Sequence, residues 1–315
     1  MVKIPISEPY FWMARSHDSL NRRLKMSVMS HLLLEDSLAA LSEESLNHLI
    51  KRASIHWKRD FKTSDVNSQI RGAKGLVSEL CIMAAYSSLD HYLNGIAAEI
   101  DRWNRHRKPG PFAISATSSE DDEYESANSK LNFWIENVPA LRALMPVVRF
   151  FITIRNCVAH RSGAVSPLLE RMSSTDELAT ALDAWPRRKG TSQPVMPEFT
   201  AHENLRLGPE HAIWASDAFL QTARQIDQFV CGTILQFDGV VSMAAYHVFI
   251  SPDPVVDIKR HRTVDRAILA ALTDRYKAQA DRSQVIPIMR SYNLWKECSK
   301  RFNQVNLETL KGESS

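Results

Sequence analysis

Cysteine and long apolar runs are scarce in this sequence, and each scarcity excludes a class of protein. Only four cysteines occur among 315 residues, far apart and without a CxxC pair: Cys81, Cys157, Cys231 and Cys298. This spacing argues against a disulfide framework and against a cysteine zinc site. No apolar run approaches the ~20 residues of a membrane span, and residues 1–16 lack the pattern of a signal peptide. We therefore expect a soluble, cytoplasmic protein without membrane contact.

A strong net charge is also lacking, since the balance is only +3. The chain is therefore not a polycation that coats nucleic acid nonspecifically, and any nucleic-acid partner must be held by local basic clusters. Such clusters stand at 105–108, 187–189 and 259–262, although most clusters of this kind are solvated loops. No phosphate-binding glycine loop, serine nucleophile elbow or HExxH zinc helix is evident. We expect neither a metal nor a cofactor.

With 10 glycines and apolar residues spaced by three and four, the sequence predicts an all-α fold. We expect three segments: an N-terminal helical arm (1–70), a helical core (71–237) with loop insertions at 104–130 and 162–208, and a mostly helical extension (238–315). The clearest helix covers 75–103, where one apolar stripe suits a bundle core. The run 240–250 is compatible with a strand or with a helix end. In the extension, Ile268, Leu272 and Tyr276 should dock on the main body or on a second copy.

Two breaks and one helix end are also predicted. Residues 26–62 suggest two helices separated near Ser42, which offers a partial cap signal. Residues 131–161 supply one further helical region, in which Pro146 is acceptable near a helix start or as a kink. Gly163 fits the left-handed residue that ends helices.

The end of that region holds polar residues that packing does not require. At about 100° per residue, one face of 147–160 is apolar and the opposite face carries Arg149, Thr153, Asn156 and His160. His160 is therefore not a core histidine. Arg155 lies at the edge of the apolar stripe, about 140° from His160. One ideal helix does not aim these two side chains together; a loosened last turn or a second subunit could help.

Arg155 is followed by Asn156 and separated from His160 by four residues. This arrangement resembles the signature of the HEPN superfamily, and the resemblance spans roughly 75–237. It implies a helical bundle that pairs about a two-fold axis and brings two Arg/His sets into one cleft. It also implies metal-independent endoribonuclease activity, in which the ribose 2′-OH attacks the adjacent phosphate and leaves a 2′,3′-cyclic phosphate. Family habit suggests a toxin or an anti-phage defence effector, with an antitoxin or another defence protein as partner.

The residue types suit this chemistry. His160 is the candidate acid/base, because the unperturbed pKa of histidine lies near ~6.5. Arg155 is the candidate cation, because its planar fork can hold two phosphate oxygens. Asn156 could orient the imidazole or the substrate. Substrate contacts are further expected from three neighbours, Arg149, Arg161 and Ser162.

Two other interpretations stay open at this point. The first is a catalytically inactive HEPN-like module that binds RNA or a protein in the same groove, an idea that the near-neutral charge favours. The second is a helix cap, in which Arg155 and His160 meet the free carbonyls and the negative end of the helix dipole.

Overall fold

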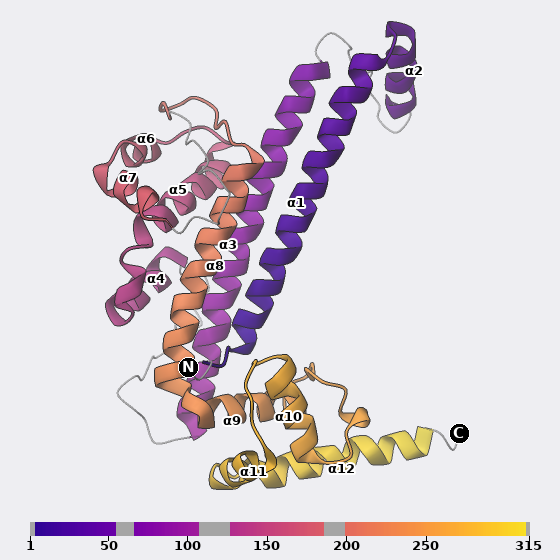
Figure 1. Cartoon of the computed structure of the whole chain (residues 1–315), viewed down its shortest axis with the longest axis vertical. Helices are drawn as coiled ribbons and strands as arrows, with labels where there is room; N and C mark the ends of the chain where they lie inside the picture. The colour runs from indigo at the N-terminus through magenta and orange to yellow at the C-terminus, as the bar shows by residue number, and fades with distance from the viewer. Residues whose placement is uncertain (1–3, 55–65, 107–126, 186–198, 313–315) are drawn as a thin grey trace. The chain divides into compact units, whose positions relative to one another are not determined.

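The computed structural model describes residues 4–54, 66–106, 127–185 and 199–312, and these are predominantly helical (Figure 1). The helices in chain order are α1 (Glu8–Ala40), α2 (Glu43–Ser54), α3 (Val66–His106), α4 (Ala127–Asn137), α5 (Met145–Arg161), α6 (Pro167–Ser173), α7 (Asp176–Asp183), α8 (Pro209–Phe229), α9 (Gln236–Phe249), α10 (Val264–Asp274), α11 (Arg282–Ser291) and α12 (Leu294–Gly312). Within the described ranges the only β pairing is an isolated bridge between Ala164 and Asn204. The predicted all-α fold is therefore confirmed for this part of the chain.

The chain divides into two compact units that do not follow chain order. Unit 1 comprises Met1–Arg15, Leu89–Arg142 and Leu220–Ser315, and unit 2 comprises Ser16–Ser88 and Ala143–Phe219. These units differ from the segments 1–70, 71–237 and 238–315 expected from the sequence, because α1, α3 and α8 each contribute residues to both units. Domain boundaries drawn between consecutive segments of the chain cannot reproduce units that share the same long helices.

The apolar stripe of α3 is buried as its spacing predicts. Its members are all less than one tenth exposed: Ile82, Tyr86, Leu89, Leu93, Ile96, Ile100 and Trp103. Alternating steps of four and three place these side chains on one face, and burying that face holds α3 in the core. The helix itself is longer than the predicted 75–103 and starts at Val66.

The breaks between helices follow local signals in two places. α1 ends at Ala40 and α2 begins at Glu43, with the Ser45 N–H donating to Ser42 Oγ at 3.3 Å. The region 131–161 is not one helix: α4 ends at Asn137, a short 3-10 turn (η3, Pro139–Leu141) follows, and α5 starts anew. Pro146 thus lies in the first turn of α5, where its missing N–H costs nothing.

Two other segments resolve into helices. The run 240–250, left between strand and helix by its sequence, belongs to α9, which follows α8 through a π-helical turn (η4, Val230–Leu235). The predicted loop insertion at 162–208 holds two short helices, α6 and α7, each capped by a hydroxyl, Ser166 for α6 and Thr175 for α7. The predicted insertion at 104–130 and the basic cluster at 187–189 lie largely or wholly outside the described residues.

Unit 2 is held together by contacts among α1, α3, α5 and α8. The buried His17 of α1 lies 2.8 Å from Ser216 Oγ of α8 through its Nδ1. On α5, Phe151 is fully buried and meets Trp214 of α8 edge to face at 5.7 Å. Because Phe150 and Ile154 are also fully buried, the apolar face of α5 is fixed and its opposite face is presented to solvent.

In unit 1 the last helices form a core of their own with the end of α3. Ile268, Leu272 and Tyr276 are fully buried, so the predicted docking of this stripe takes place within the chain. One stretch of the described residues, Pro209–Phe249, is long and apolar enough to cross a membrane by composition. Because 61% of its apolar window is buried inside the protein, the core position accounts for this composition, and the stretch is weak evidence for a membrane segment.

Unit 1 also buries a carboxyl group at Asp227 of α8, which is 1% exposed. Ser7 donates to this carboxyl from its hydroxyl, at 2.5 Å, and from its backbone N–H, at 3.2 Å. Burial outweighs these two bonds and raises the pKa of Asp227 to about 7. The buried Glu99 nearby raises this pKa further.

The raised pKa of Asp227 predicts that unfolding depends on pH in a defined direction. The folded state retains this proton more strongly than the unfolded state, so the stabilisation is complete below about pH 4 and is lost as the pH rises through about 7. A shift from 3.8 to about 7 corresponds to at most about 4 kcal/mol. Urea unfolding of the wild type and of Asp227→Asn at pH 4, 6 and 8 measures this contribution to the free energy of unfolding. We expect the stability of the wild type relative to Asp227→Asn to fall over this range; a constant difference contradicts the prediction.

Candidate active site at the end of α5

The motif helix ends in two consecutive left-handed residues. Ser162 has φ 52° and Gly163 has φ 82°. The N–H groups of Ser162 and Gly163 both donate to the carbonyl of Cys157, which satisfies the helix end through the backbone. Gly163 therefore adopts the left-handed conformation predicted for it, and the serine before it does so as well.

α5 brings Arg155, Asn156 and His160 together within one chain. Arg155 Nη1 donates to Asn156 Oδ1 at 3.0 Å and lies 3.2 Å from His160 Nε2. Because a guanidinium can only donate, this contact fits the tautomer in which His160 Nε2 accepts and Nδ1 carries the proton. Within this chain, neither a loosened last turn nor a second subunit is needed for this contact. The helix stays regular from residue 145 to 161, and the long arginine side chain itself spans the angle.

Arg155 is a cation without a carboxylate partner among the described residues. Its guanidinium carbon lies 4.5 Å above the ring centroid of Tyr86, on α3. Its Nε is buried and has no hydrogen-bond acceptor in the part of the chain that the structure describes. A positive group that is held by a ring and by neutral acceptors keeps its charge available for an anion.

A carboxyl group from α3 faces the same helix end. A Cβ at Gly163 would lie 3.8 Å from Glu79 Oε1 and 4.0 Å from Oε2. Burial raises the pKa of the Glu79 carboxyl. In the described part of the chain Glu79 makes no hydrogen bond or ion pair. This carboxyl therefore adds a third ionisable side chain to the surroundings of the motif.

The remaining candidate residues lie on the exposed side of α5. Arg149, Arg161 and Ser162 are exposed, as are Asn156 and His160. Arg149 shares the face of His160 but precedes it by eleven residues, which is ~16 Å along the axis. Arg149 could therefore reach only a distant part of a substrate, whereas Arg161 and Ser162 adjoin His160 directly. The wheel prediction that this face is solvent-accessible is confirmed.

The helix-cap interpretation does not describe these side chains. In the described contacts, Arg155 hydrogen-bonds to Asn156 and to His160, and neither Arg155 nor His160 donates to a carbonyl at the end of α5. The carbonyl of Cys157 is instead satisfied by backbone N–H groups. Capping by hydrogen bonds is therefore not what places these residues here, although the helix dipole still favours positive charge at this end.

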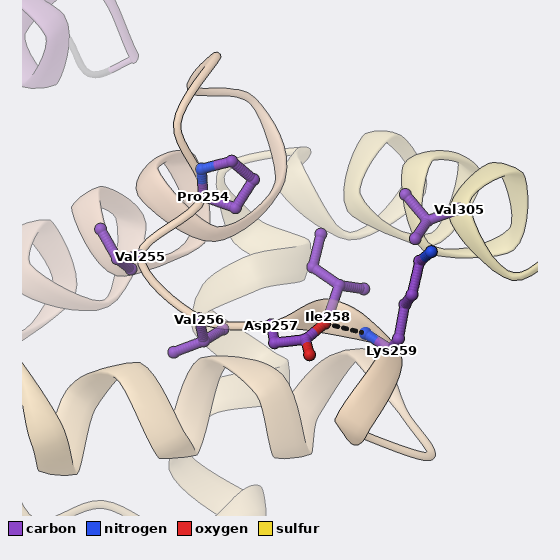
Figure 2. A pocket seen from close by; sticks show the side chains of 7 residues that line it. All are labelled: Pro254, Val255, Val256, Asp257, Ile258, Lys259 and Val305. Carbon is purple, nitrogen blue, oxygen red and sulfur yellow. Dashed lines mark hydrogen bonds between the residues drawn. The ribbon is translucent and has the colours of Figure 1, made fainter. Parts of the chain in front are cut away.

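Elsewhere in the described chain, the candidate sites have fewer side chains available for catalysis or for binding a ligand. A hollow of about 420 Å³ in unit 1 is lined by Pro254, Val255, Val256, Asp257, Ile258, Lys259 and Val305 (Figure 2). Its carboxylate, Asp257, already accepts from the Lys259 N–H at 3.2 Å and pairs with Arg260 at 3.1 Å. Among the described residues, no group of three or more His, Cys, Asp or Glu side chains could hold a metal ion.

Two residues of the site had no identifiable role in the sequence. Tyr86 is indistinguishable there from the other members of the α3 stripe, and Glu79 is one polar residue of many on that helix. The sequence feature that relates Tyr86 to Glu79 is their spacing of seven residues, which places both on one face of α3. Which face meets α5 depends on how the two helices pack, and this spacing does not encode it.

The chain was also compared with known proteins. No protein-family model, curated protein or solved structure matches it. The function must therefore be argued from the geometry of this site and from the resemblance of its motif.

Proposed function

We propose that this protein is a metal-independent endoribonuclease of the HEPN type, with the site at the end of α5. The observation that supports the proposal best is the pairing of an uncompensated guanidinium with an exposed imidazole at 3.2 Å. RNA cleavage by its own 2′-OH requires a cation beside the phosphate and groups that move protons, and this pair supplies both kinds. A role as a toxin or in anti-phage defence, with an antitoxin or defence partner, rests on the resemblance of the motif alone.

In the proposed reaction a substrate phosphate replaces His160 Nε2 as the acceptor of the Arg155 Nη1 hydrogen bond, and the guanidinium stays beside the imidazole. The freed lone pair takes the proton of the ribose 2′-OH as O2′ bonds to phosphorus. The bond between phosphorus and O5′ breaks, and O5′ takes a proton from a second acid. Arg155 meanwhile stabilises the negative charge of the pentacoordinate phosphorus. The products are a 2′,3′-cyclic phosphate end and a 5′-OH end.

The second acid is proposed to be the protonated His160 of another copy in a homodimer. Exposed apolar side chains in unit 2 support self-association. On α3, Leu76 and Leu80 are each 56% exposed and flank Glu79 on the helix surface. On α1, Met26, Met29 and Leu33 are more than half exposed. Apolar surface of this kind on a soluble protein marks a site of interaction, and a two-fold interface would double the Arg155/His160 pair.

The homodimer proposal predicts that a charge on the α3 surface prevents self-association. Leu76→Asp and Leu80→Asp should each raise the dimer dissociation constant at least tenfold, because a carboxylate would be buried without a partner in the interface. Analytical ultracentrifugation over a range of concentrations measures this. Leu49→Asp is the matched control, because Leu49 is 47% exposed on α2. A wild-type monomer at all concentrations, or an equal effect of Leu49→Asp, rejects this interface.

The activity is tested by incubating the wild-type protein with total cellular RNA in EDTA and mapping the cut ends. Cleavage that leaves 2′,3′-cyclic phosphate and 5′-OH ends, with EDTA present, is the expected result. Cleavage that requires added Mg²⁺, or 3′-OH ends, would contradict the proposed chemistry. Intact RNA that is nevertheless bound by the protein would favour the inactive binding module instead.

A further inference from the structure

Tyr86 reaches the motif from a helix that is distant in sequence. Its side chain is 8% exposed, and its ring centroid lies 4.5 Å from the guanidinium carbon of Arg155. Behind it, the fully buried Phe219 of α8 meets the ring edge to face at 6.2 Å. The ring is therefore fixed in the core and offers one face to Arg155.

The guanidinium has few other restraints. Arg155 Nη1 donates to Asn156 Oδ1, which belongs to an exposed side chain, and to His160 Nε2. The buried Nε donates to nothing in the described chain. A carboxylate, the usual means of orienting an arginine, is not among its described contacts. Since Asn156 and His160 are both solvent-exposed, the buried ring is the one rigid contact of this group.

We propose that Tyr86 is a positioning residue, whose ring holds the Arg155 guanidinium beside His160 and thereby keeps the Nε2 lone pair of the imidazole toward Arg155. The inference rests on the proposed function, in which these two side chains perform the reaction. The stack orients the plane of the guanidinium, and the Nη1 donor then selects the His160 tautomer with its proton on Nδ1. In this tautomer Nε2 carries the lone pair that accepts the 2′-OH proton.

The contact involves the ring face and not the hydroxyl of Tyr86. Tyr86→Phe should therefore retain the stack, and Tyr86→Leu should remove it while keeping an apolar side chain in the core. A purely structural role would make the two variants differ in stability alone. Tyr92→Leu is the matched control, because Tyr92 is a fully buried tyrosine of the same helix that contacts Tyr10 and belongs to unit 1, whereas the motif belongs to unit 2.

The test that does not depend on catalysis is ¹⁵N NMR of histidine-labelled protein, which distinguishes the two imidazole tautomers. The His160 signal is identified by its loss in His160→Ala. We expect the Nδ1–H form in wild type, Tyr86→Phe and Tyr92→Leu, and a shift toward the Nε2–H form in Tyr86→Leu. An Nε2–H form in wild type, or an unchanged tautomer in Tyr86→Leu, overturns the proposal. If Tyr86→Leu does not fold, pentafluorophenylalanine in place of Tyr86 keeps the shape, reverses the charge of the ring face and takes over the same test.

RNA cleavage provides the second measurement. Tyr86→Leu should lower kcat about 10- to 100-fold with little change in KM, because a misplaced group slows chemistry more than it weakens binding. Tyr86→Phe should stay within about threefold of wild type. Equal kcat in Tyr86→Leu and wild type contradicts the positioning role. If wild type cuts no RNA but the tautomer follows the ring, the nuclease proposal fails and the role of Tyr86 in placing Arg155 stands.

Discussion

His160→Ala should abolish RNA cleavage while leaving the fold intact. The substitution removes the group proposed to accept the 2′-OH proton, and loss of a general acid/base lowers rates by about 10²- to 10⁴-fold. In the proposed dimer the same change removes the acid as well, so we expect at least the upper part of that range. Rates of cleavage of a short single-stranded RNA, measured in EDTA, give the value.

The fold should survive because His160 is exposed and its described hydrogen bond is to Arg155. The free energy of unfolding, measured by thermal denaturation, should therefore change by less than about 0.5 kcal/mol, as is usual for surface substitutions. His91→Ala is the matched control, since His91 is an exposed histidine of α3 outside the motif. Cleavage that persists in His160→Ala, or is lost equally in His91→Ala, would exclude His160 as the acid/base.

Arg155→Lys should reduce kcat about 10²- to 10³-fold, the size of effect seen when one preorganised donor to a developing anion is removed. Charge is conserved in this change, but the flat fork is lost. An ammonium has no flat face to offer the Tyr86 ring, and it cannot also donate to Asn156 and His160 and hold two phosphate oxygens. Single-turnover cleavage of the same RNA separates this loss from weaker binding.

The control for Arg155→Lys is Arg171→Lys, because Arg171 is an exposed arginine of α6 in the same unit. That variant should cleave like wild type. If Arg155→Lys retains more than about a third of wild-type kcat, a point charge is sufficient and the orientation of the guanidinium contributes little. Tyr86→Leu would then also be expected to remain active, so the two experiments check each other.

Local signals predicted several elements correctly. The hydroxyl of Ser42 marks the break between α1 and α2, and the spacing of apolar residues in α3 marks its buried face. Gly163 has the left-handed conformation expected at the end of α5. Each of these features depends on residues within a few turns of one another, where backbone geometry and side-chain period act directly.

Other features could not be obtained in this way. Pro146 suits either a helix start or a kink, and the choice depended on how 138–144 pack before α5. The run 240–250 is apolar on all sides, so its period could not distinguish a strand from the buried helix α9 that it forms. The two units could not be predicted from the sequence either, because α1, α3 and α8 are continuous helices whose residues belong to both units.

For the candidate site, the sequence by itself determined that Arg155, Asn156 and His160 lie near the end of one helix and that His160 faces solvent. It also determined that this helix stops at Gly163. Only the tertiary structure decided which side chains meet this helix end: Tyr86 lies against Arg155 and Glu79 lies near Gly163, both from α3, some seventy residues earlier in the chain. The physical reason is that helical period sets the face on which a residue lies, whereas packing between helices sets which faces meet.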